Sequence, residues 1–561
     1  MPARQAAGGE ITTNEMAITD TSPAVTGTSP AETRPATAST GLAAVVGTGD
    51  HKTLGRLYLG CSLLLGALAL GVLAWGQFEA TGDPASQTDR ALDNFALGRL
   101  GLVFLLVAPF FVGLATAIVP LQVGARTIAF PRAAAAAFWG WLLSSALFLV
   151  SHLASVGGGV AGSDGNGVGL TYISLIGIAA SLLLGVICLA TTVIGLRPPG
   201  MYLDRVPFFS WSIVVVAGIW VLTFPAFVVN VVLLFMDQKY GAGAFAVEGG
   251  PWAQLAWITG PPQVFAFAIP ALGVLADITS TLSGARQPQR GALLAAIGAF
   301  GAFGFGAYVQ PAFNPGAYHQ LPFAAQSAFA VLALLGVLAG IGGAARKGKV
   351  SLKSPTLLGL GGFLVLLLGV VLTVPFGLGR LGLQTSPKAV ADVAPGLEAA
   401  IAGSPIYTWG LAALVLVGAL AVGIGGVFFW ASKITGRQLP EALGMLLALG
   451  ALVGAIVLGA PFLVLGFANK SEGLADSTKA FFGISAVGAV IVLAVALVLV
   501  LLIIGNRASV LSSGSPGDLD PWGTGQTLEW ATDSPPAPGN FGELATVTSP
   551  EPLLDLAEGG D

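Results

Sequence analysis

The sequence predicts an all-α membrane protein with about twelve transmembrane helices. Two observations carry this prediction. Hydrophobic residues make up 55% of the chain and charged residues only 9%, and the mean hydropathy is +0.83. In addition, the apolar residues gather into long uninterrupted segments, which a water-soluble globular protein of 561 residues does not need. The composition therefore excludes a soluble enzyme.

The apolar segments are long enough to cross a bilayer as helices. A spanning helix needs roughly 20 apolar residues, because its backbone groups must be paired internally where water is absent. The segments that meet this length cover residues 55–77, 95–119, 133–155, 170–195, 209–236, 254–282, 290–311, 321–343, 355–377, 404–431, 440–467 and 478–505.

Basic residues concentrate in alternate loops, which predicts the orientation of the chain, because Lys and Arg in short loops resist translocation. The basic loops contain Lys52, Arg56, Arg126, Arg132, Arg197, Arg205, Arg286, Arg290, Arg346, Lys347, Lys349, Lys353, Lys433, Arg437 and Arg507. The opposite loops hold few bases and several acids, such as Glu79 and Asp164. We therefore expect a multi-pass plasma-membrane protein with both termini in the cytoplasm.

The ends of the chain differ from the apolar region between them. Residues 1–50 are rich in Ala, Thr, Gly, Pro and Ser and have no hydrophobic run, so we expect a disordered cytoplasmic tail. Residues 51–506 form the predicted transmembrane domain, and 507–561 form a polar, Pro-rich cytoplasmic tail. The net charge of −4 gives no indication of a nucleic-acid partner, and membrane lipid is the expected surrounding.

The two cysteines lie far apart in different apolar segments. Cys61 and Cys188 have no cysteine or histidine nearby at ligand spacing. Neither residue therefore indicates a metal site or a disulfide.

Several short motifs follow one another along the chain. The segments are Val119–Arg126 (VPLQVGAR), Phe130–Arg132, Leu196–Met201 (LRPPGM), Val206–Trp211 (VPFFSW), Trp257–Phe265 (WITGPPQVF), Thr435–Arg437, Asp520–Gly523 (DPWG), Thr527–Trp530 (TLEW), Ser534–Pro536 and Asn540–Phe541. In order and spacing, over about residues 55–545, this set resembles subunit I of the haem-copper (cytochrome c) oxidases. The alternative is an unrelated transporter with twelve spans.

The resemblance implies a ligand set that this chain lacks. The family holds two haems and one copper with six histidines from four helices, because neutral imidazole binds both metals well. This chain has three histidines in all. Aligned on the flanking motifs, the haem-ligand positions fall on Gly98, Gly410 and Ala412. The copper-ligand positions fall on Pro261, Ala307 and Tyr308.

The proton-path positions of the family are also replaced. The acidic residue of its cytoplasmic loop corresponds to Thr127, and its glutamate and tyrosine beside the copper correspond to Gln263 and Phe265. Ligands and proton-carrying groups are therefore missing together. We expect neither haem nor copper to bind, and we predict no other metal site.

The remaining histidines lie at the ends of the predicted spans. His51 precedes the first span, and we expect it to be a solvated flank. His152 and His319 fall at the outer face, where a shared metal is a less favoured alternative because no acidic or cysteine partner lies at ligand spacing.

Polar residues within spans are costly and are therefore candidates for function. Arg99 lies next to a vacated haem position; we favour a side chain that extends to the outer boundary over one that binds a lipid or substrate anion. Asp277 lies near the inner end of its span, and we expect its side chain to be exposed to water. Gln263, Tyr308 and Gln310 either line a polar cavity or bond across helices.

Three hypotheses follow. The favoured one is a redox-inactive relative of oxidase subunit I that acts as a structural, assembly or regulatory subunit of a respiratory complex. The second is a catalytic cytochrome c oxidase subunit that reduces oxygen and pumps protons. The third is a protein that binds or transports quinone, lipid or a small solute in the vacated haem cavities.

Overall fold

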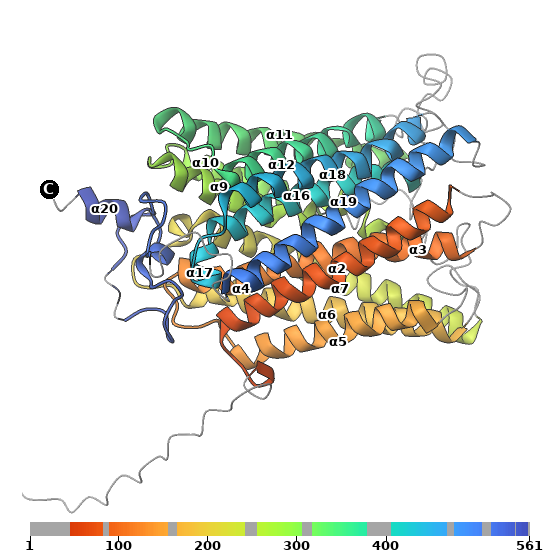
Figure 1. Cartoon of the computed structure of the whole chain (residues 1–561), viewed down its shortest axis with the longest axis horizontal. Coiled ribbons are helices and arrows are strands. Elements are labelled where there is room, and N and C mark those ends of the chain that lie inside the picture. The colour runs from red at the N-terminus through yellow and green to blue at the C-terminus, as the bar shows by residue number, and fades with distance from the viewer. Residues whose placement is uncertain are drawn as a thin grey trace, which may run out of the picture. The chain divides into compact units, whose positions relative to one another are not determined.

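The computed structural model describes residues 45–81, 89–154, 165–241, 255–305, 317–378, 405–467, 476–507, 518–542, 544 and 546–558. Contacts divide the chain into two units, Met1–Gly47 and Thr48–Asp561. The second unit is a bundle of long helices, which run side by side in Figure 1. No strand occurs in the part of the chain that the structure describes.

Within the described ranges, ten helices are long and apolar enough to cross a membrane. Their elements are α2 (His51–Glu79), α3 (Asp89–Gly101) continued by η2 (Leu102–Val107) and α4 (Ala108–Gln122), α5 (Pro131–Ala154), α6 (Gly165–Gly195), α7 (Phe208–Tyr240), α11 (Ala317–Lys347), α12 (Ser354–Val371), α16 (Pro405–Phe429), α18 (Glu441–Phe467) and α19 (Asp476–Arg507). These helices match ten of the expected spans.

Two further apolar helices in the described part of the chain are shorter than a full span. They are α9 (Ile269–Ser283) and α10 (Arg290–Phe303), which lie in the sixth and seventh expected segments. The end of the seventh segment lies outside the described residues. The all-helical class is confirmed, while a count of twelve spans stays a prediction.

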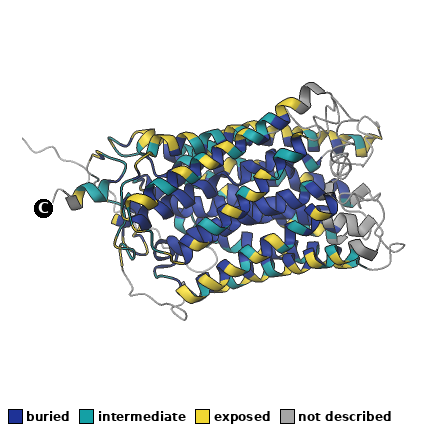
Figure 2. Cartoon of the chain, turned by 90° about the horizontal axis from the view of Figure 1, so that it is seen from above, coloured by how far each residue is buried: buried dark blue, intermediate teal, exposed yellow. Residues whose placement is uncertain are grey.

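Two spans occupy the centre of the bundle. The most apolar windows of Ala96–Gln122 and Tyr407–Phe429 are entirely buried, whereas those of the other eight long helices are only partly buried. Figure 2 shows the same division, with buried ribbon inside and exposed positions on the outer helices. A helix that is apolar all round belongs inside a bundle, and an outer helix keeps an apolar face for lipid.

The first central span contains a π-helical segment, Leu102–Val107, between α3 and α4. The segment ends just before Pro109, the second residue of α4. Proline has no amide hydrogen to donate to the carbonyl four residues earlier, so regular α-helical bonding is interrupted there. The sequence predicted one continuous span and did not reveal this irregularity.

The C-terminal region packs on one end of the bundle. Trp522 Nε1 donates to the carbonyl of Phe429 (3.1 Å), and the backbone N–H of Val547 donates to the carbonyl of Pro199 (2.9 Å). Trp530 in η6 (Leu528–Ala531) is only 2% exposed. These parts of the predicted polar tail are therefore ordered against the helices, and α20 (Pro552–Glu558) follows them.

Candidate functional site

The first vacated haem position, Gly98, faces a neighbouring helix at very short range. It lies in α3, and a Cβ atom at this position would come within 2.5 Å of Leu73 Cβ in α2. Real Cβ contacts are essentially never this short. The Leu73 side chain therefore occupies the space that a side chain at position 98 would need.

The vacated positions on α16 are closed in the same way. A Cβ at Gly410 would lie 2.8 Å from the carbonyl oxygen of Gly459 and 3.0 Å from Leu463 Cδ2, both in α18. Ala412 has no exposed surface. Glycines that face each other let two membrane helices approach closely and pack by dispersion. Residue 410 therefore serves a helix contact in this chain.

The vacated copper position lies in a stretch that is not a regular helix. The bond between Pro261 and Pro262 is cis, and the flanking residues form two 3₁₀ segments, η4 (Ala256–Ile258) and η5 (Gln263–Phe267). The sequence predicted one span over residues 254–282, whereas the α-helix begins only at Ile269. Adjacent prolines explain the difference, because they remove backbone donors and restrict the preceding residue.

Both proton-path replacements in this stretch are fully buried. Gln263 Nε2 lies 3.4 Å from Thr223 Oγ1 of α7, which favours bonding across helices. The Phe265 ring stacks on Phe300, with ring centroids 5.8 Å apart. Thr127 is exposed in the turn after α4. The predicted positions Ala307, Tyr308 and Gln310 lie outside the described residues.

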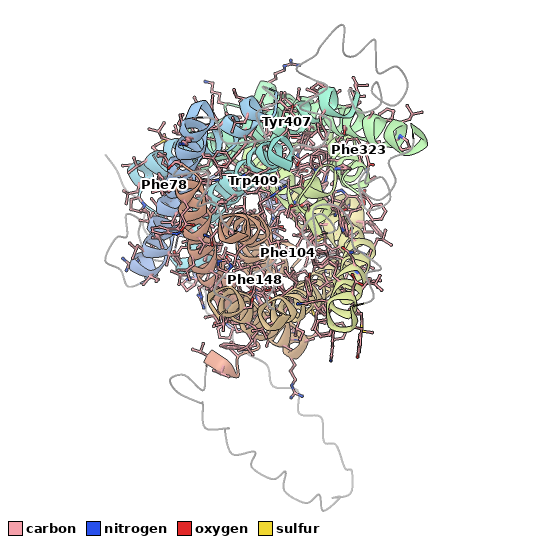
Figure 3. The ribbon with its side chains drawn as sticks, turned by 90° about the vertical axis from the view of Figure 1, so that its right-hand side faces the viewer. Phe78, Phe104, Phe148, Phe323, Tyr407 and Trp409 are labelled. Carbon is pink, nitrogen blue, oxygen red and sulfur yellow. The ribbon has the colours of Figure 1, made fainter. Side chains whose placement is uncertain are left out.

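A cluster of aromatic rings occupies the interior near this stretch. The Phe104 ring stacks on Phe227 at 5.4 Å and contacts the Phe267 ring at 6.1 Å. Trp220 stacks on Phe224 at 4.8 Å. Figure 3 shows Phe104 inside the ring of helices. This part of the interior is thus filled by side chains of η2, α7 and η5.

Arg99 is buried, which corrects the expectation that its side chain extends to the boundary. It is 1% exposed, and its Cζ atom lies 5.2 Å from the centre of the Trp409 ring in α16. A guanidinium over an indole is a favourable cation–π pair, particularly where water is excluded. Arg99 therefore joins the two central spans at the vacated haem positions.

His51 is also buried, and the expectation of a solvated flank is wrong. It is 1% exposed; its Nδ1 lies 3.0 Å from the Thr116 carbonyl and its Nε2 lies 2.9 Å from Asn540 Nδ2. The apolar pattern of the span did not reveal this role, because the partner Asn540 is far away in the sequence. His51 fastens the C-terminal region to the bundle.

The outer histidines have different surroundings. His152 Nε2 lies 2.8 Å from Asn94 Oδ1, while the side chain of His319 is outside the described part. Over the ranges that the structure describes, no three or more His, Cys, Asp or Glu side chains gather in a group that could hold a metal ion.

The residues that the structure adds form a polar network beneath the C-terminal region. Asp277 was expected to be wet, yet it is 6% exposed and accepts hydrogen bonds from the backbone amides of Phe208 (2.9 Å) and Phe209 (3.1 Å). Gln122 Nε2 donates to Asp277 Oδ2 (2.8 Å) and also to Glu529 Oε1 (3.3 Å). Gln122 and Glu529 both lie in motifs noted in the sequence, which is the signal that could have indicated them.

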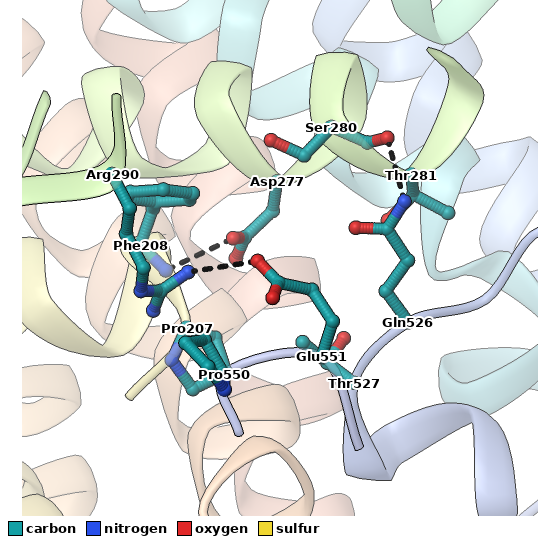
Figure 4. Close-up of a pocket in the computed structure, with 10 residues that line it drawn as sticks. All are labelled: Pro207, Phe208, Asp277, Ser280, Thr281, Arg290, Gln526, Thr527, Pro550 and Glu551. Carbon is teal, nitrogen blue, oxygen red and sulfur yellow. Dashed lines mark hydrogen bonds and ion pairs between the residues drawn. The ribbon is translucent and has the colours of Figure 1, made fainter. Parts of the chain in front are cut away.

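The network opens on a small polar pocket, shown in Figure 4. The pocket has a cavity volume of about 10 Å³, which is room for about one water molecule. Asp277, Arg290, Gln526 and Glu551 are among its lining residues. Burial raises the pKa of Glu529 and also that of Glu551. Two carboxyl groups near this end of the bundle are therefore shifted toward their neutral form.

The fold and its polar framework define the chain as a polytopic helical membrane protein of the oxidase subunit I type. Residues 54–381 match the family described as Cytochrome C and Quinol oxidase polypeptide I. The chain belongs to this family.

Similar proteins cover nearly the whole chain. A probable cytochrome c oxidase subunit 1-beta of Nocardia farcinica is 28% identical, over 92% of this chain and 88% of that protein. A putative subunit 1-beta of Streptomyces coelicolor is 29% identical, over 91% and 89%. A cryo-EM structure of a heme-copper terminal oxidase dimer aligns with a TM-score of 0.55 and 13% identity, over 90% of this chain and 89% of that chain. This last likeness supports the fold alone.

Proposed function

We propose that this chain is a redox-inactive relative of oxidase subunit I and serves a respiratory oxidase complex as a structural, assembly or regulatory subunit. The observation that carries the proposal is the set of residues at the ligand positions, namely Gly98, Pro261, Gly410 and Ala412. Their side chains contain only hydrogen or hydrocarbon, whereas haem iron and copper need a nitrogen, sulfur or oxygen donor.

The packing at these positions supports the same proposal. Leu73 fills the space beside Gly98, and the backbone of α18 lies against Gly410. A histidine would have no room at either position unless a helix moved. The described residues therefore do not fit a haem held in the manner of the family, and we derive no electron-transfer or oxygen-reducing step for this chain.

Membership of the oxidase subunit I family supports a role within a complex. The motifs that contain Gln122, Trp522, Glu529 and Asn540 are all engaged in contacts at one end of the bundle. We further propose that this end faces the cytoplasm, that both termini lie there, and that membrane lipid and other oxidase subunits are the partners. Nucleic acid has no place in this proposal.

The competing function is catalytic oxygen reduction, which the names of the relatives favour. It requires metal ligands of types that the family does not use, or ligands from residues outside the described ranges. Binding of a quinone, lipid or small solute requires open space, and the close packing at Gly98 and Gly410 favours this function less.

An optical spectrum distinguishes the two main functions. We expect the full-length protein, purified from its native membrane, to show no haem band in a reduced-minus-oxidised spectrum and no stoichiometric iron or copper by elemental analysis. A haem-containing oxidase purified in the same detergent is the control. Haem and copper in stoichiometric amounts would overturn the proposal.

A further inference from the structure

Two buried carboxyl groups approach the same amide nitrogen. Asp277 belongs to α9, and Glu529 belongs to η6 in the C-terminal region. Both accept a hydrogen bond from Gln122 Nε2, at 2.8 and 3.3 Å. Ser210 Oγ in turn donates to Gln122 Oε1 (2.8 Å) and fixes the orientation of the amide. The two acids therefore form a close pair although they are far apart in the sequence.

The hydrogen bonds favour different charge states for the two acids. Asp277 accepts two further bonds, from the Phe208 and Phe209 amides at the N-terminus of α7, where the helix dipole also stabilises an anion. Glu529 Oε1 accepts a second bond of the same length, 3.3 Å, from Trp430 Nε1. Glu529 Oε2 is buried and has no hydrogen-bond partner among the residues described. Glu529 is therefore the weaker site for a negative charge.

Two basic side chains interact electrostatically with the acids from a distance, Lys433 with Glu529 and Arg290 with Asp277, but their direct hydrogen bonds go to other groups. Lys433 Nζ donates to the Thr532 carbonyl (2.6 Å) and to Ser534 Oγ (3.0 Å). Arg290 donates to the carbonyls of Asp204 and Val206. Within the described ranges, neither side chain forms an ion pair with Asp277 or Glu529.

Arg290 forms an ion pair instead with Glu551, at 3.7 Å across the pocket. Two carboxylates in a buried site without a bonded cation repel each other strongly, because burial weakens screening by water. A single proton on one of them removes this repulsion. Burial also raises the pKa of Glu529.

The pocket reaches one acid of the pair, Asp277. It is lined by Asp277 and reaches Glu551, with room for about one water molecule. Figure 4 shows the Asp277 and Glu551 carboxyl groups facing this space, with Arg290 beside them.

We propose that Asp277 and Glu529 form a proton-binding site, in which Glu529 holds one proton at neutral pH and Asp277 carries the charge. Proton exchange with the solution takes place on the Asp277 side of the site, where the pocket between α9 and Glu551 lies. Protonation of Glu529 is coupled to the docking of the C-terminal region on the bundle, because Glu529 lies in that region and its partners lie in the bundle. A glutamate with a raised pKa binds its proton more tightly in the folded state. Its contribution to folding is therefore full at acidic pH and is lost as the pH rises through its folded pKa.

Infrared spectroscopy of the full-length protein in lipid tests the site. At pH 7 we expect a carbonyl stretch of a protonated carboxylic acid that shifts in D₂O and disappears in Glu529→Gln. Glu441→Gln is the matched control, because this exposed glutamate binds Ser354 at the start of α12; it should leave the band unchanged. No band in the folded wild type at pH 7, or an undiminished band in Glu529→Gln, would overturn the proposal.

A second variant keeps the test decisive if Glu529→Gln does not fold. Asp277→Asn removes the neighbouring negative charge, so Glu529 should ionise more readily. We expect the band to remain at acidic pH and its titration midpoint to fall by about 1 pH unit. A midpoint that stays fixed, or a band that vanishes at every pH, would show that Glu529 does not share a proton site with Asp277.

Discussion

At the level of single residues, the vacated ligand positions are sites of close packing. Gly98 accommodates the side chain of Leu73, and Gly410 allows α16 and α18 to touch through their backbones. Each of these two lost ligands coincides with a tightened contact between helices. These glycines therefore contribute to stability in a way that a histidine cannot.

The close contact at Gly410 predicts that a larger side chain there lowers the stability of the protein. Gly410→Ala should destabilise the protein by roughly 1–3 kcal/mol, because the added methyl group meets Gly459 and Leu463 and overpacks the crossing. Thermal unfolding in detergent measures the change.

Gly218→Ala is the matched control. Gly218 lies within α7, and no atom lies within 4 Å of the position that an added methyl group would occupy. Both variants gain the same intrinsic preference of alanine for a helix. Equal midpoints for the two variants would contradict the proposed close contact.

At the level of elements, the C-terminal region (518–542, 544 and 546–558) covers one end of the bundle, and we call it the cap. Asn540 has a positive φ of 60° and donates through Nδ2 to the Ala125 carbonyl at 2.9 Å. Lys433 and His51 hold neighbouring parts of the same region. The region is thus fixed by buried polar contacts with loops and helix ends that are distant in the sequence.

Loss of the Asn540 side chain should loosen this cap. Asn540→Gly keeps the backbone conformation and removes the bonds to Ala125 and His51, at a cost of about 1–3 kcal/mol. Limited proteolysis with mass spectrometry should show faster cleavage within 518–542. Asn540→Ala should have a larger effect, because alanine also resists a positive φ.

Thr548→Ala is the control for this experiment. Thr548 lies in the same region, and its side chain makes an exposed bond of 3.4 Å to Asp555. Unchanged cleavage in Asn540→Gly would mean that Asn540 does not anchor the cap.

At the level of the whole molecule, two central spans are surrounded by helices with one apolar face toward lipid. The cap, the His51 end of α2 and the polar pocket all lie at the same end of the bundle, because they contact one another. The distribution of basic loops predicts that this end is cytoplasmic.

Thiol labelling tests the predicted orientation. Tyr202 lies in the loop before α7, and Tyr240 is the last residue of α7; they are 65% and 66% exposed. In a chain with Cys61→Ala and Cys188→Ala, an impermeant maleimide should label Tyr240→Cys in intact cells. It should label Tyr202→Cys only in inverted membrane vesicles. The reverse pattern would contradict the orientation.

The sequence by itself determined the membrane class, ten of the long helices and the family framework. Hydropathy and short motifs are local properties, so they can be recognised without knowledge of the neighbours. The same local properties predicted that His51 and Asp277 are exposed to water. This was wrong, because their neighbours Asn540 and Glu529 are far away in the sequence.

Only the tertiary structure decided which polar groups are buried together and which interior positions are filled. Arg99 meets Trp409, Gln122 joins Asp277 to Glu529, and Leu73 fills the space beside Gly98. Each of these outcomes depends on contacts between different segments of the chain. The physical reason is that burial and close packing are properties of the assembled bundle, whereas the tendency to span a membrane belongs to each segment alone.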